Sequence, residues 1–243
     1  MPAESASLDA PFAAVAAFDW GGDTEPLAVI DAAVVAAGSD PGLRADLERR
    51  FAAVLAGEAS QAARQYVCRQ LCLIGTAASV PALAAMLTDP DDSHMARYAL
   101  ERIDAPEAAT ALRAALAELE GNLRVGMIAS LAARGDAASV PILASLVAGD
   151  SAVAAAAAEA LGRLATPEAA AALAGAATSG ETAERVVDAR LACAAAAVAA
   201  GDKPAARAIY KAVGEAVGGA PATHRGRAVR IACQRGLLAT LGG

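Results

Sequence analysis

Apolar residues recur at helical spacing along this chain, in a unit that returns about every 30 residues. Residues 77–84, AASVPALA, come back as residues 137–144, AASVPILA, and related segments begin at Ala105 and Thr166. A weaker copy begins at Gly201. Self-similarity at this period is the signature of stacked supersecondary units. The pattern therefore predicts a repeat protein.

Each repeat is predicted to hold two helices. The first opens with a proline in its first turn, such as Pro81, and the second ends in an Ala-Leu-Xaa-Xaa-apolar segment, such as residues 99–103 or 160–164. The expected pairs are 10–18 with 25–37, 42–56 with 60–74, 77–88 with 92–103, 106–119 with 122–133, 137–148 with 151–164, 167–177 with 181–200, and 203–217 with 222–240. One pair cannot bury its own apolar face, but stacked pairs share a core. The expected fold is all-α, a right-handed superhelix (solenoid) of about seven antiparallel helix pairs.

The repeats are expected to form one domain over residues 1–243. Residues 60–177 carry clear repeats, whereas residues 1–59 and 178–243 fit the period and match the motif poorly. The first helix pair is acidic and holds Trp20, Phe12 and Phe18, so it is expected to cap the N-terminal end.

The amino-acid composition supports the prediction of an all-helical fold and argues against a membrane-spanning segment. Of the residues, 56% are hydrophobic but only 3% aromatic, because most are alanine, the best helix former. The longest apolar run covers residues 191–200, whereas a spanning helix needs about 20 residues. Residues 1–5 lack the basic and apolar regions of a signal peptide. We expect no membrane insertion and a cytoplasmic location, with a trimmed export signal as the alternative.

Residues 60–177 resemble the short HEAT repeats of the phycobilisome-lyase type. In that family the second helix begins with an apolar residue and an arginine, seven positions before the signature leucine. Arg64 precedes Leu71 at that offset, and Arg124 precedes Leu131. Two repeats depart: Ala154 precedes Leu161, and Asp92-Ser93 precedes Leu100. The resemblance implies the fold, while its members serve as scaffolds, lyase subunits, hydroxylases and nucleic-acid binders.

The segment 91–102 departs most from the alanine-rich pattern. His94, Arg97 and Glu101 are spaced to share one helix face, where they could bind a polar or anionic ligand. The candidate binding residues, predicted to form a stripe over neighbouring second helices, are Arg64, His94, Arg97, Tyr98, Glu101 and Arg124. The structural alternative is an ion-pair ladder of Arg97 with Glu101, with Arg64 and Arg124 hydrogen-bonded to neighbouring turns.

No residue pattern predicts catalysis, a metal or a cofactor. The chain has two histidines and no His-Glu dipeptide, which excludes an iron-dependent hydroxylase of the deoxyhypusine type. Cys68 and Cys72 are four apart, unlike the usual zinc spacing. Four buried thiols are expected, with a Cys193–Cys233 disulfide as the alternative. Neither a glycine-rich phosphate loop nor a nucleophile elbow is present.

Charge is unevenly spread along the chain, whose net charge is −7. Residues 1–60 carry ten acidic and three basic side chains, whereas residues 201–243 carry two acidic and seven basic ones. Either these are solvated faces, or the basic end meets an acidic partner or a second molecule head to tail. The basic segment 223–235 is short and has no aromatic stacking partner, so nucleic acid is an unlikely partner.

The sequence favours a non-catalytic scaffold that binds a protein partner on the concave face formed by its second helices. The alternative is a lyase-like or small-ligand-handling subunit that uses the polar stripe around His94 and Arg97. The two differ in whether those side chains are free to meet a ligand.

Overall fold

The structure is a computed structural model that describes residues 8–148, 151–218 and 223–241. Over these residues it is 77% helix without strands, and 14 α-helices pack in neighbouring pairs, which confirms the all-α prediction. The chain forms two compact units, unit 1 (Met1–Ser130) and unit 2 (Leu131–Gly243). The boundary between them falls inside one helix, α8 (Gly121–Ala133).

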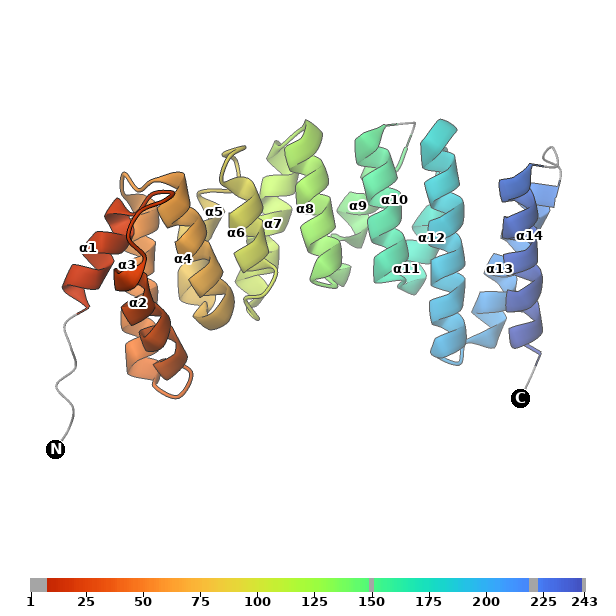
Figure 1. Ribbon diagram of the computed structural model, residues 1–243. Helices are drawn as coiled ribbons and strands as arrows, with labels where there is room; N and C mark the ends of the chain where they lie inside the picture. Colours follow the sequence, from red (N-terminus) through yellow and green to blue (C-terminus); the bar gives the residue numbers. More distant parts are fainter. Residues whose placement is uncertain (1–7, 149–150, 219–222, 242–243) are drawn as a thin grey trace. The chain divides into compact units, whose positions relative to one another are not determined.

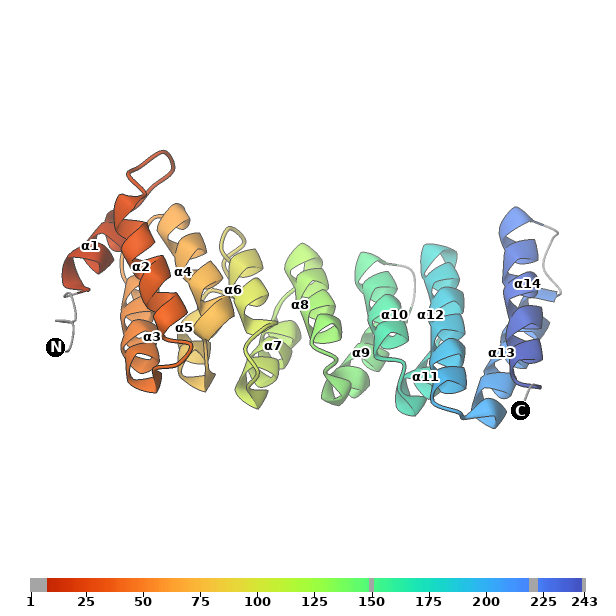
Figure 2. The ribbon, with the colours of Figure 1, turned by 60° about the horizontal axis from the view of Figure 1, so that its bottom comes forward.

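Unit 1 is built from two layers of helices. Its elements are α1 (Asp9–Ala17), α2 (Glu25–Ala36), α3 (Pro41–Ala56), α4 (Gln61–Ile74), α5 (Val80–Ala84), α6 (Ser93–Leu100), α7 (Pro106–Glu118) and the first part of α8. The second helices of the repeats, α4, α6 and α8, lie side by side, and α3, α5 and α7 lie behind them (Figure 1). The view turned by 60° shows the same two layers (Figure 2).

Unit 2 repeats this arrangement with longer helices near its C-terminal end. Its elements are α9 (Val140–Leu146), α10 (Ala152–Leu164), α11 (Pro167–Ala174), α12 (Gly180–Ala199), α13 (Lys203–Gly218) and α14 (His224–Ala239). Helices α10, α12 and α14 form the second-helix layer (Figure 1). Leu161, Cys193, Val213 and Val229 are among its buried side chains.

The helix starts follow from local sequence. Ser60, Ser151 and Thr166 each accept a hydrogen bond from the backbone N–H three residues ahead, which satisfies one unpaired donor at the start of α4, α10 and α11. Pro106 and Pro167 occupy the first helical position, where a missing N–H costs nothing. Outside the segments 77–88 and 137–148, the predicted bounds of the helices agree closely with the observed ones. Residue 222, the predicted start of the last helix, and residues 1–5 lie outside the described residues.

The segments 77–88 and 137–148 do not form the full-length helices that were predicted. Each has a 3-10 turn, at Ala77–Ser79 and Ala137–Ser139, followed by the short helices α5 and α9. In the segment 77–88, the turn is bound by the buried carboxylate of Glu48 on α3. This carboxylate accepts hydrogen bonds from the backbone N–H of Thr76 at 2.7 Å and from the Ser79 hydroxyl at 2.6 Å. This long-range contact holds the turn at 77–79, whereas in the second segment the Ser139 hydroxyl donates to the Asp136 carbonyl at 2.6 Å.

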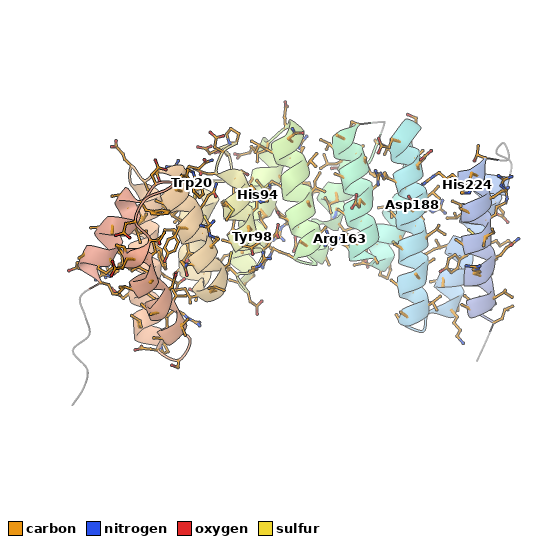
Figure 3. The ribbon with its side chains drawn as sticks, in the orientation of Figure 1. Trp20, His94, Tyr98, Arg163, Asp188 and His224 are labelled. Atoms are coloured by element: carbon orange, nitrogen blue, oxygen red, sulfur yellow. The ribbon has the colours of Figure 1, made fainter. Side chains whose placement is uncertain are left out.

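The N-terminal cap forms without its tryptophan. The Phe12 ring lies 5.1 Å from the ring of Phe51, and both side chains are buried. Phe18 is half-buried. Trp20, which was predicted to belong to the cap, is 61% exposed in the loop between α1 and α2 (Figure 3).

Small residues set the distance between α10 and α12. A Cβ atom at Gly162 of α10 would lie 2.7 Å from both the Cα and the Cβ of Ala189 on α12. Because real Cβ atoms essentially never come this close, only glycine fits at that point of contact. Gly236 of α14 plays the same part against the Tyr210 ring of α13.

None of the helices among the described residues has both the length and the apolar content needed to cross a lipid bilayer. The ten-residue apolar run 191–200 belongs to α12, which also carries charged residues such as Arg185 and Asp188.

Replacing Gly162 with alanine should destabilise unit 2. The added methyl overlaps Ala189, and overpacking of this kind costs about 1–3 kcal/mol, more than alanine gains in helix propensity. We expect a lower midpoint in urea unfolding followed by circular dichroism.

Gly214→Ala is the matched control, because a Cβ there would sit at an ordinary 3.7 Å from the Cβ of Cys233. This variant should gain about 0.5–1 kcal/mol from the better helix former. Equal effects of the two variants would contradict the proposed close contact of α10 and α12.

Candidate binding surface

The six predicted site residues all lie on or next to the second helices of unit 1. Arg64 is on α4, Arg124 is on α8, and the other four belong to α6 or its C-terminal cap. The structure divides the six into two groups. Four make contacts within the fold, and two are exposed to solvent.

Arg64 links α4 to the start of α6. Its Nε lies 2.5 Å from Oδ2 of Asp92, and its Nη1 donates to the Ala59 carbonyl. Asp92 is buried and occupies the place where other repeats carry an apolar residue. A buried carboxylate needs a charged or hydrogen-bonding partner, so this departure from the repeat motif is explained by Arg64.

Arg97 and Glu101 link α6 to α8. Nη1 of Arg97 donates to the Gly126 carbonyl at 3.1 Å and to the Ser130 hydroxyl at 3.2 Å, and Ser130 donates to Oε1 of Glu101 at 2.6 Å. A Cβ at Gly126 would lie 2.7 Å from Cζ of Arg97, so the guanidinium packs directly on the α8 backbone. Burial lowers the pKa of Arg97, and the nearby Glu101 charge partly offsets this effect.

This network refines the predicted ion-pair ladder. The two side chains were expected to pair at i, i+4 along α6, whereas the Ser130 hydroxyl of the next repeat bridges them. Arg124 was expected to hydrogen-bond a neighbouring repeat's turn, whereas its Nε donates at 3.3 Å to the Leu116 carbonyl of α7, the first helix of its own pair. Arg64, Arg97, Glu101 and Arg124 therefore hold helices together.

His94 and Tyr98 remain exposed, one turn apart on α6 (Figure 3). The Arg102 guanidinium lies 3.7 Å from the centre of the Tyr98 ring, and its Nη1 donates to the Tyr98 carbonyl at 3.0 Å. Arg102 was missed from the sequence, although its four-residue spacing from Tyr98 was a usable signal. Arg69, also exposed, adds a second unpredicted cation from α4.

A groove between α10 and α12 is a second candidate surface, in unit 2. Two adjoining hollows of about 440 Å³ and 320 Å³ share Glu159 and Arg185. Alanines line much of it, and Arg163 on α10 and Asp188 on α12 add charge (Figure 3). No residue pattern predicted this groove, because a groove depends on how far apart two helices lie.

The basic C-terminal segment is partly neutralised within unit 2. Arg225 at the start of α14 pairs with Asp188 at 2.8 Å and with Glu184 at 3.2 Å, both on α12. These ion pairs, mainly the hydrogen bond to Asp188, raise the pKa of Arg225. Arg225 therefore ties α14 to α12 and is not available to a polyanion.

The four cysteines are free thiols, so Cys193 and Cys233 are not joined. The prediction of four buried thiols is wrong for Cys72, which is half-buried with Sγ 3.6 Å from the Tyr98 carbonyl. Burial raises the pKa of Cys68 to about 12 and that of Cys72 to about 11. Both thiols are therefore protonated at neutral pH.

Among the described residues, no group of three His, Cys, Asp or Glu side chains is placed to hold a metal ion. Comparison of the chain with protein-family models and with curated protein sequences gave no match in either case. The resemblance to HEAT-like repeats thus remains a prediction from the repeat motif.

Arg97→Ala tests whether this side chain is structural. Removing it breaks two hydrogen bonds and leaves the Gly126 carbonyl and the Ser130 hydroxyl without the Arg97 donor, so the free energy of unfolding should fall by about 2 kcal/mol. Arg69→Ala is the matched control on an exposed neighbour and should change stability by less than about 0.5 kcal/mol. Urea titrations of both variants would show it; an unchanged midpoint for Arg97→Ala would contradict the network.

Cys72 should react with N-ethylmaleimide faster than the other thiols, yet at least about tenfold slower at pH 8 than in the unfolded chain. Its raised pKa keeps the thiolate scarce, so the rate should rise about tenfold per pH unit up to pH 10. Mass spectrometry after timed quenching measures this rate. A plateau near pH 8 would show an ordinary thiol pKa instead.

Proposed function

We propose that this protein is a HEAT-like helical-repeat module that binds a protein segment on its second-helix face and performs no chemistry of its own. In a right-handed superhelix of such repeats this face is the concave one. The repeat motif and the pairwise packing of the helices support this architecture.

The observation that carries the proposal is the stacked pair of Tyr98 and Arg102 beside His94. Tyrosine and arginine are enriched among the residues that dominate protein–protein binding energy. Here the tyrosine is 37% exposed, and the cation already lies on its ring, so little side-chain entropy is lost on binding. With Arg69, this patch favours a partner segment that carries carboxylates and an apolar side chain.

The groove between α10 and α12 offers a second place for the same partner or another one. Its alanine floor allows a close approach of a partner backbone, and Glu159 and Arg163 are both exposed at its edge. Such shallow, mixed-charge surfaces are typical of non-obligate protein contacts.

The alternative of a ligand-handling subunit stays a prediction. It requires Arg97 and Arg124 to meet a ligand, and both guanidinium groups make hydrogen bonds inside unit 1. No contact of these residues favours it over the binding module.

The test is an affinity capture from native lysate with wild type and a His94→Ala/Tyr98→Ala/Arg102→Ala variant, quantified by mass spectrometry. A partner retained by wild type should be reduced at least about tenfold with the variant, since loss of two such anchors costs over 1.4 kcal/mol. Glu159→Ala/Arg163→Ala probes the groove separately.

The matched control is Arg49→Ala/Glu118→Ala, which removes exposed charges from α3 and α7 in the other helix layer. It should retain the partner. If the control loses the same proteins as the triple variant, binding does not depend on the second-helix face and the proposal fails.

A further inference from the structure

The outer face of the last helix, α14, alternates basic and large apolar side chains. His224, Arg227, Ile231, Arg235 and Leu238 follow one another at intervals of three or four residues and therefore share one face. Ile231 is 49% and Leu238 67% exposed. The opposite face, with Val229 and Cys233, packs against Val213 of α13 and side chains of α12.

Such a face is unusual for a surface helix. Arg227 precedes Ile231 by about one turn and Arg235 lies between Ile231 and Leu238; both arginines are exposed, and so is Leu241 just beyond the helix. Exposed aliphatic groups that cluster with arginine are typical of an interface that meets a partner with both apolar and acidic groups.

The loop between α1 and α2 has the complementary chemistry. Trp20, the one tryptophan of the chain, is exposed there (Figure 3), and in the sequence it stands between Asp19 and Asp23, with Glu25 following. Asp19 accepts from the Trp20 backbone N–H at 2.8 Å and Asp23 from that of Glu25 at 2.9 Å. These short contacts order the loop while leaving the residues exposed.

We infer that the Trp20 loop of one molecule docks on the outer face of α14 of a second copy. The indole would cover Ile231 and Leu238, and Arg227 and Arg235 would pair with the acidic residues around it. Charge complementarity supports this occupant, because residues 1–60 carry seven more acidic than basic side chains and residues 201–243 five more basic than acidic ones. Arginine is also attracted to an indole face.

The contact joins two different patches, so it is heterologous. Each copy that uses its α14 face still has a free Trp20 loop, and association continues into rings or open chains unless a patch is removed. The interface contains ion pairs near the surface, so it weakens as salt screens them. This inference does not rest on the proposed function, which concerns a different face.

The experiment uses two complementary variants of the full chain. The loop variant is Trp20→Ser/Asp23→Ser, and the helix variant is Ile231→Asp/Leu238→Asp. Sedimentation velocity should show wild type growing in mass with concentration and each variant alone as a monomer. A mixture of the two should give a one-to-one dimer and nothing larger, because only one intact interface can form.

Tryptophan fluorescence gives a second readout of the same mixture. The loop variant has no tryptophan, so all emission comes from Trp20 of the helix variant. Titrating the loop variant into it should shift this emission to shorter wavelength as the indole leaves water, and raising the salt should reverse the shift.

Leu73→Asp, which changes a 71% exposed leucine on α4, is the matched control and should associate like wild type. Arg227→Glu/Arg235→Glu is a second helix variant in case the first is misfolded by circular dichroism. Monomeric wild type at all concentrations overturns the inference. So does a mixture without dimer, or self-association of either variant alone, which would indicate a like-to-like contact or a different partner.

Discussion

The close approach of neighbouring second helices is the constraint on which the rest of this structure depends. At the contacts where it can be judged atom by atom, one partner has no side chain: Gly126 faces the Arg97 guanidinium, and Gly162 faces the Cα of Ala189. Alanine surrounds these points, because a methyl group fills little space and loses no rotamer entropy.

Close packing favours a protein partner for a polar group at the seam. In unit 1 these partners come from the next repeat. Tyr66 and Gln70 of α4 donate to the Asp31 carboxylate of α2 at 2.8 Å and 2.9 Å. Asp92 pairs with Arg64, and Arg97 bonds across to α8. The polar stripe along the second helices is thus mainly what holds successive repeats in register.

The same constraint explains what the sequence could and could not predict. Repeat period, helix pairs and prolines at helix starts depend on residues close in sequence, and the helix bounds follow them. The turn at 77–79 also contacts Glu48, about thirty residues earlier, and no local pattern shows that contact. Gly75 is the C-cap of α4. Its φ is not positive, and a Cβ there would lie 2.8 Å from Cδ1 of Ile103, so close approach explains it.

The predicted site residues show a similar limit of local sequence. Helical spacing placed His94, Arg97 and Glu101 on one side of α6, but spacing cannot distinguish a side chain that faces a neighbour from one that faces solvent. The Arg97 side chain lies toward α8 and donates hydrogen bonds to the Gly126 carbonyl and the Ser130 hydroxyl, whereas the Tyr98 side chain, one residue later, is exposed. The exposure of Trp20 could not be predicted from the sequence either, because an aromatic residue in a terminal helix pair is expected to pack into the cap.

The two units meet the packing constraint with different chemistry, and this affects where each can bind. Unit 1 uses arginines and carboxylates as links between helices, so fewer of them remain for a partner and its free groups gather at Tyr98 and Arg102. In unit 2, α10 and α12 meet through Gly162 and Ala189, which need no polar link. Because the seam is apolar, Glu159 and Arg163 stay exposed along the groove. Glu159 and Arg163 can therefore change without disturbing the contact between the two helices, whereas Asp188 at the same groove also pairs with Arg225 of α14.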